Sequence, residues 1–158
     1  MNSWLRGFAV AFDLEASSQE LAALFTIDHL GIAVKSLTQA RKFYERLGLA
    51  VVSEEVIDHE KVRVGMIPVG ESRIELLEAT GPDSVIARFV AKRGEGLHHV
   101  AIHVPDLTHA IETLKASGTR FISEEIKVGA GGHLYVFVHP QSAGGVLVEL
   151  VQEQPEGV

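Results

Sequence analysis

The sequence has no cysteine, which excludes disulfide bonds, thiolate zinc sites and cysteine nucleophiles. It is also short of basic residues: 14 Lys and Arg against 21 Asp and Glu give a formal net charge of −7 at pH 7. Because binding to nucleic-acid phosphates needs a basic surface, this balance argues against a nucleic-acid partner. A small anionic substrate is still compatible with it, since a metal ion and a few cations can dominate the local field.

Long apolar runs are missing as well. No stretch approaches the roughly 18 consecutive apolar residues that a membrane-spanning helix needs, so we expect no membrane partner. An apolar patch from Phe8 to Phe12 is ended by Asp13 and is too short for the apolar region of a secretory signal. We therefore expect a cytoplasmic protein, with residues 1–25 as an N-terminal extension and residues 26–153 as one domain.

What the sequence does contain is an internal repeat. Two apolar runs rich in β-branched residues, 27–34 and 97–104, are typical of strands. Each is followed by an amphipathic segment that begins at a helix-capping residue, Ser36 or Asp106. Each of these segments is closed by a glycine and followed by three further strand candidates. The further strands are predicted at 49–57, 62–69 and 73–78 in the first half, and at 121–128, 133–138 and 145–151 in the second.

This order predicts an α+β fold made of two tandem βαβββ modules. Module one covers residues 26–80, module two covers residues 96–153, and a helix over residues 83–93 links them. Neither four-stranded module can bury both of its faces alone. We therefore expect the modules to pair into one curved mixed sheet around a metal site, with the helices outside.

Four side chains occupy equivalent places in the two modules. His29 and His99 lie at the same point of their first strands, and Glu75 and Glu149 lie at the same point of the last strands. Because side chains alternate along a strand, each glutamate points away from its two apolar neighbours. The histidine and the carboxylate of each module should therefore project into one concavity, where all four become candidate metal ligands.

A set of two imidazoles and two carboxylates suits a divalent ion such as Co, Mn, Ni, Zn or Fe. An octahedral ion with four protein ligands keeps two positions for substrate oxygens, and it can act as a Lewis acid toward an enolate-like transition state. Two carboxylates on opposite sides of the ion suit a 1,1-proton transfer, in which one group removes the proton and the other returns it. Glu149 and Glu75 are thus the candidate catalytic residues. The same alternation predicts that His98 points to the opposite face from His99.

These residues resemble the vicinal oxygen chelate superfamily and, within it, the methylmalonyl-CoA epimerase family. The resemblance covers residues 27 to 152, and its most telling stretches are 27–34, 75–78, 96–101, 123–132, 139–140 and 144–150. It implies that His29, His99 and Glu149 are metal ligands and that Glu75 occupies a ligand position that varies between glutamate and glutamine. It also implies Co(II) or a related ion, a homodimer, an acyl-CoA substrate, and interconversion of (2R)- and (2S)-methylmalonyl-CoA.

One position departs from the resemblance. Some bacterial members carry a proton-transferring glutamate on the third strand, where this chain has Val64. Glu75 is therefore our candidate for the second base. The alternatives are a glyoxalase-type lyase or isomerase, a non-catalytic small-molecule-binding module of the same fold, and, ranked low, a ring-cleaving dioxygenase. The sequence leaves the native metal and the choice between methylmalonyl and ethylmalonyl substrates open.

Overall fold

The computed structural model describes residues 22–154. Most of the expected N-terminal extension therefore lies outside the described residues. Within the described range, no helix is both long and apolar enough to cross a membrane.

Eight strands form one mixed sheet in the order β2-β3-β4-β1-β5-β8-β7-β6. The parallel pairs β1–β4 and β5–β8 belong to the two modules, and the antiparallel pair β1–β5 joins the modules at the centre. The elements of the first half are β1 (Thr26–Val34), α3 (Leu37–Leu47), β2 (Ser53–Ile57), β3 (Val62–Val69), β4 (Ser72–Ala79) and α4 (Val85–Arg93). Those of the second half are β5 (Gly96–His103), α5 (Leu107–Ala116), β6 (Lys127–Val128), η1 (Ala130–Gly132), β7 (Leu134–Val138), η2 (Pro140–Ser142) and β8 (Val148–Gln152).

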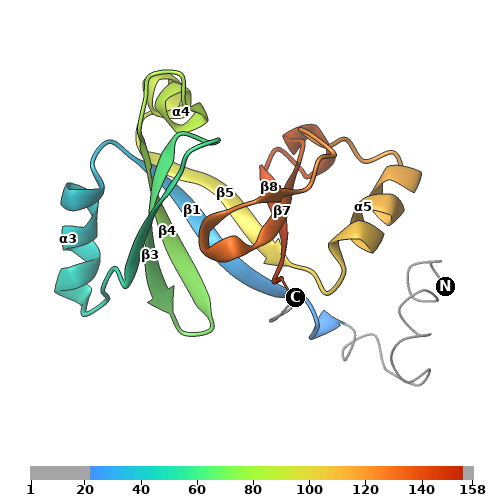
Figure 1. Ribbon diagram of the computed structural model, residues 1–158, viewed down its shortest axis with the longest axis horizontal. Helices are drawn as coiled ribbons and strands as arrows, with labels where there is room; N and C mark the ends of the chain where they lie inside the picture. Colours follow the sequence, from blue (N-terminus) through green and yellow to red (C-terminus); the bar gives the residue numbers. More distant parts are fainter. Residues whose placement is uncertain (1–21, 155–158) are drawn as a thin grey trace.

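The sheet is curled, with α3 outside one half and α5 outside the other (Figure 1). Leu37 of α3 packs with Ile67 and Leu76 of the first module, whereas Leu107 of α5 packs with Leu150 of the second. The predicted α+β fold of two paired modules with outer helices is confirmed.

The helix termini follow the capping pattern of the sequence. The Ser36 hydroxyl accepts a hydrogen bond from the Gln39 N–H at 3.2 Å, and the Asp106 carboxylate accepts one from the His109 N–H at 2.9 Å. Gly48 ends α3 with φ 94°, a left-handed conformation that glycine adopts at low cost. Local capping therefore sets where the outer helices begin and end.

Alternation along β4 and β8 directs the two glutamates to the inner face of the sheet. Leu76 belongs to the core cluster under α3 and is fully buried, so Glu75 points to the other side. In the same way Leu150 packs in the cluster under α5, and Glu149 faces the concavity. The outer helices thus fix the orientation of the strands that carry the site.

The second module differs from the prediction at its edge. Of the predicted strand 121–128, only β6 and an isolated bridge between Phe121 and Val138 form. A turn interrupts the segment, in which the Ser123 hydroxyl accepts a hydrogen bond from the Glu125 N–H at 3.2 Å. Helix α4 starts after Ser84, whose hydroxyl accepts from the Ile86 N–H at 3.1 Å.

Candidate metal centre and active site

Three buried donor atoms meet at the centre of the sheet. His29 Nε2 lies 3.0 Å from His99 Nε2, and Glu149 Oε2 lies 3.1 Å from the first and 2.9 Å from the second. The three residues are 4%, 5% and 7% exposed. The atoms therefore form a nearly equilateral triangle shielded from bulk water, and among the described residues they are the group whose geometry suits a metal ion.

The size of this triangle fits octahedral coordination. Two neighbouring donors that are each about 2.1 Å from an ion lie about 3.0 Å apart in an octahedron and about 3.4 Å apart in a tetrahedron. The observed separations of 2.9 to 3.1 Å match the octahedral value. The three residues would therefore fit around one divalent ion.

Glu75 lies beside this triangle. Its Oε2 is 3.3 Å from His29 Nε2, and the residue is 6% exposed. The structure therefore brings the four residues predicted from the repeat together, with three of them in the tight donor set and Glu75 at its edge.

Gly31 makes room for the His99 ring. It pairs with His99 across the β1–β5 ladder, and a Cβ atom at this position would lie 2.7 Å from His99 Nε2 and 2.5 Å from Nδ1. Side chains larger than hydrogen would push the imidazole out of the triangle. Sequence reasoning missed this role, although a glycine inside a strand is a known signal of close approach.

A half-buried carboxylate orients the first histidine. His29 Nδ1 lies 2.7 Å from Asp28 Oδ2, and Arg73 Nη2 lies 2.5 Å from the same oxygen. When Nδ1–H donates to Asp28, the lone pair of Nε2 faces the triangle, as metal coordination requires. The Asp28–Arg73 pair is thus a positioning device for His29.

A second histidine contacts the His99 ring nitrogen that is not part of the donor triangle. His98 Nδ1 lies 2.9 Å from His99 Nδ1, and His98 lines the same cavity as His99. The prediction that His98 points to the opposite face is wrong. In the β1–β5 register Gly31 pairs with His99 and Ile32 with Leu97, so His98 is the extra residue of a bulge that breaks the alternation.

Comparison with known proteins places this site in a family. Residues 28–137 match the glyoxalase/bleomycin resistance protein/dioxygenase superfamily. Human mitochondrial methylmalonyl-CoA epimerase is 41% identical over 128 residues, which cover 80% of this chain and 73% of that protein. The chain belongs to the methylmalonyl-CoA epimerase family of this superfamily.

Two further relatives agree with this assignment. The ethylmalonyl-CoA/methylmalonyl-CoA epimerase of Cereibacter sphaeroides is 37% identical over 129 residues, which cover 80% of this chain and 96% of that protein. A variant of the Streptomyces coelicolor methylmalonyl-CoA epimerase, solved in complex with 2-nitronate-propionyl-CoA, has a TM-score of 0.78 and 35% identity. That match covers 84% of this chain and 99% of the other. The resemblance to the epimerase family seen in the sequence is therefore confirmed.

The two carboxylates of this epimerase-family site are electrostatically unlike. Burial raises the pKa of Glu149, but hydrogen bonds from His29 and His99 outweigh it and lower the pKa to about 2. Burial raises the pKa of Glu75, and the nearby Glu149 charge adds to this. For His29, burial lowers the pKa, but hydrogen bonds to Asp28 and Glu149 and the charge of Glu75 raise it to about 10. The metal-free site therefore favours an imidazolium, and a bound cation would replace its charge.

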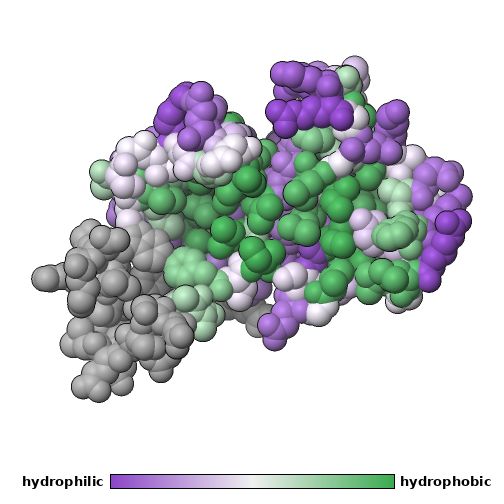
Figure 2. All heavy atoms as spheres, turned by 180° about the vertical axis from the view of Figure 1, so that it is seen from behind, coloured by the Kyte–Doolittle hydropathy of each residue, from purple (hydrophilic) through white to green (hydrophobic). Residues whose placement is uncertain are grey.

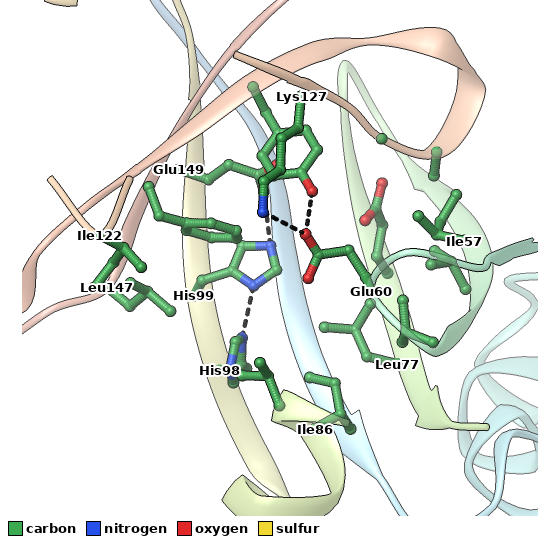
Figure 3. A pocket seen from close by; sticks show the side chains of 18 residues that line it. Ile57, Glu60, Leu77, Ile86, His98, His99, Ile122, Lys127, Leu147 and Glu149 are labelled. Atoms are coloured by element: carbon green, nitrogen blue, oxygen red, sulfur yellow. Dashed lines mark hydrogen bonds and ion pairs between the residues drawn. The ribbon is translucent and has the colours of Figure 1, made fainter. Parts of the chain in front are cut away.

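Two members of the donor triangle, His99 and Glu149, line a cavity of about 300 Å³ (Figure 3). Its wall carries Glu75, His99 and Glu149 together with apolar side chains such as Leu77. Val64, which stands at the position of the expected third-strand glutamate, is part of this apolar wall. The cavity can therefore hold a small, partly apolar ligand next to the donors.

Opposite His99, a polar cluster ties the two modules together across the cavity (Figure 3). The Tyr135 hydroxyl donates to Glu60 Oε1 at 2.5 Å, and Lys127 Nζ lies 3.6 Å from the same oxygen. Burial raises the pKa of Tyr135, and Glu60 adds to this, so the phenol stays protonated as the donor. Sequence reasoning missed this cluster because its members are far apart in the chain and follow no repeat.

Proposed function

We propose that this protein epimerises methylmalonyl-CoA at C2, interconverting its (2R) and (2S) forms by 1,1-proton transfer. The observation that carries the proposal is the buried triangle of His29, His99 and Glu149, with Glu75 beside it, at the wall of a largely apolar cavity. Membership of the methylmalonyl-CoA epimerase family supports the same reaction.

The triangle and Glu75 would hold a divalent ion. Two imidazoles and two carboxylates favour a borderline ion, and we propose Co(II) ahead of Mn, Ni, Zn or Fe. A bound ion supplies Lewis-acid stabilisation of the negative charge that develops on the thioester carbonyl oxygen.

Glu149 and Glu75 are the proposed proton-transfer groups. They come from β8 and β4, which flank the central β1–β5 pair on opposite sides. A planar carbanion-like species held between them would therefore meet one carboxylate on each face, so that one removes the C2 proton and the other returns it. Val64 cannot exchange a proton, and Glu75 lies on the other side of the central strand pair from Glu149, so we propose Glu75 as the second base.

The acyl pocket suits a short branch at C2. Val64 and Leu77 are buried and face the cavity, and Phe137 packs edge-on to His99 with ring centroids 5.3 Å apart. These apolar walls suit an alkyl branch at C2, and we propose methylmalonyl-CoA as the preferred substrate because the family carries that name. A relative is named for both ethylmalonyl-CoA and methylmalonyl-CoA, so a competition assay between the two measures the preference.

We also propose that two copies form a homodimer. One face of the molecule is broadly apolar (Figure 2). Large apolar side chains are exposed on the chain, including Phe43 at 64%, Leu47 at 68% and Val52 at 63%. Apolar area of this kind usually marks an interface. Light scattering after size-exclusion chromatography should give twice the chain mass, and a monomeric mass would refute this part of the proposal.

Solvent-deuterium exchange at C2 of methylmalonyl-CoA tests the reaction. After metal removal, added Co(II) should restore both exchange and racemisation, followed by NMR. Glu75→Gln should keep most of its metal but lose about 10²- to 10⁴-fold of the epimerisation rate, the usual contribution of one acid–base group.

Glu71 is exposed at the β3–β4 turn. Glu71→Gln makes the same substitution there, serves as the matched control and should stay fully active. A metal-loaded protein without exchange would overturn the proposal and direct attention to glyoxalase-type substrates. A metal-loaded Glu75→Gln protein with full activity would overturn the assignment of the second base.

A further inference from the structure

A basic surface on α4 adjoins the catalytic cavity. A second cavity of about 470 Å³ is lined on one side by Arg88, Lys92 and Arg93 of α4. It shares Val85, His98, His99 and Leu147 with the cavity of the candidate active site, so the two cavities lie on either side of a common wall. Figure 3 shows His98 and Ile86 at the end of the catalytic cavity nearest α4.

The three cations of this surface are available to an anion. All three are exposed, and no described carboxylate lies within ion-pair distance of any of them. Arg88 donates to the Asp83 carbonyl at 2.6 Å, and the Arg93 guanidinium lies 5.8 Å from the centre of the Phe89 ring. The residues that line the second cavity include no acidic side chain. In a chain of net charge −7 this is a local positive field.

Exposed apolar side chains lie beside the three cations in the second cavity. Leu97 is 56% exposed and Val146 42% exposed, and both line the second cavity together with Val85. A ligand that spans the two adjoining cavities is therefore anionic at the α4 end, less polar in the middle, and reactive at the donor triangle. The thioesters of coenzyme A have this order: phosphates and nucleotide, pantetheine arm, acyl group.

We propose that Arg88, Lys92 and Arg93 bind the phosphate groups of the coenzyme A part of the substrate. This inference rests on the proposed function, because it takes the acyl group to lie at His99 and Glu149. Val85, Arg88 and Lys92 are spaced by three and four residues and share one face of α4, so the helix presents two cations and one apolar contact in a row. Guanidinium and ammonium groups suit phosphate through charge-assisted hydrogen bonds.

Direct binding of coenzyme A to the full chain tests this subsite without requiring catalysis. Calorimetric titrations with coenzyme A, dephospho-coenzyme A and pantetheine compare ligands that differ in phosphate content. Arg88→Gln and Lys92→Gln should each raise the Kd for coenzyme A about five- to tenfold. The two variants should leave pantetheine binding unchanged. The Kd of the wild type should also rise with NaCl.

The matched control is Arg46→Gln. Arg46 lies in the last turn of α3, so this change removes the same charge from a corresponding helix terminus that lines neither cavity. If Arg46→Gln weakens coenzyme A binding as much as the α4 variants, net charge explains the effect and the subsite is refuted. Unchanged Kd values in the α4 variants, or a wild type that does not bind coenzyme A, also refute it. The methylmalonyl thioester of pantetheine lacks the phosphate groups. Its racemisation, measured in parallel, therefore tests the proposed reaction separately from the phosphate subsite.

Discussion

Replacing Gly31 with alanine should damage the metal centre more than the fold. The new Cβ atom would lie 2.7 Å from His99 Nε2, well inside normal contact distance, and the neighbouring β-ladder holds both backbones in register. The imidazole must therefore move away from His29 and Glu149. Since ligand misplacement of this kind typically lowers metal affinity about 10- to 100-fold, we expect that loss for Co(II), measured by competition with a chelator. Overpacking should also cost about 1–3 kcal/mol of stability.

Gly65→Ala separates the two effects. A Cβ atom at Gly65 would lie 2.8 Å from Leu37 Cδ1, so this variant is also overpacked, but against the α3 core instead of a ligand. Both variants should unfold at lower temperature than the wild type, and only Gly31→Ala should lose Co(II) affinity. The reasoning fails if Gly31→Ala binds Co(II) as tightly as the wild type, or if Gly65→Ala loses as much affinity.

Three further predictions concern the surroundings of the ligands. Asp28→Asn should lower Co(II) affinity about 10- to 100-fold by chelator competition, because Nδ1 of His29 loses its charged acceptor. In the metal-free protein the pKa of His29 is raised from 6.5 to about 10, so its contribution to stability is complete below pH 6.5 and is lost as pH rises toward 10. The free energy of unfolding, measured by denaturation at several pH values, should show this loss. The gain in the free energy of unfolding on adding Co(II) should grow over the same pH range, because the ion needs the neutral imidazole. Tyr135→Phe should cost about 1–3 kcal/mol in thermal denaturation, because the partly buried Glu60–Tyr135 hydrogen bond disappears, while Co(II) affinity stays at the wild-type value.

The internal repeat was sufficient to predict the parts of the structure that depend on local periodicity. Strand alternation placed Glu75 and Glu149 on the inner face, because their apolar neighbours must pack against the outer helices. The repeat also predicted that the four candidate ligands converge, since equivalent strands of paired modules meet at the centre of the sheet.

Features that depend on register or on distant contacts were beyond the sequence. The bulge that turns His98 toward His99 arises from the pairing of β5 with β1, and nothing in the order of apolar residues marks it. The close approach of Gly31 to the His99 ring depends on the same register. The Glu60–Tyr135 bond joins residues 75 positions apart, one of them in a hairpin turn, so only the assembled sheet creates it.

The duplicated modules supply candidate ligands at equivalent positions, but the surroundings of these residues differ. Glu149 accepts from both imidazoles, whereas Glu75 contacts only His29 closely, and the pKa values of the two carboxylates move in opposite directions from their ordinary value. The partners of the two histidines differ too. His29 Nδ1 contacts the charged Asp28, whereas His99 Nδ1 contacts His98. Burial lowers the pKa of His98 to about 4. His98 is therefore neutral where Asp28 is anionic. In the proposed reaction one group takes a proton from one face of a carbon and a second group returns it to the other face, and the repeat provides two carboxylates at equivalent positions for these roles. The difference between their neighbours then decides which of them more readily holds the proton.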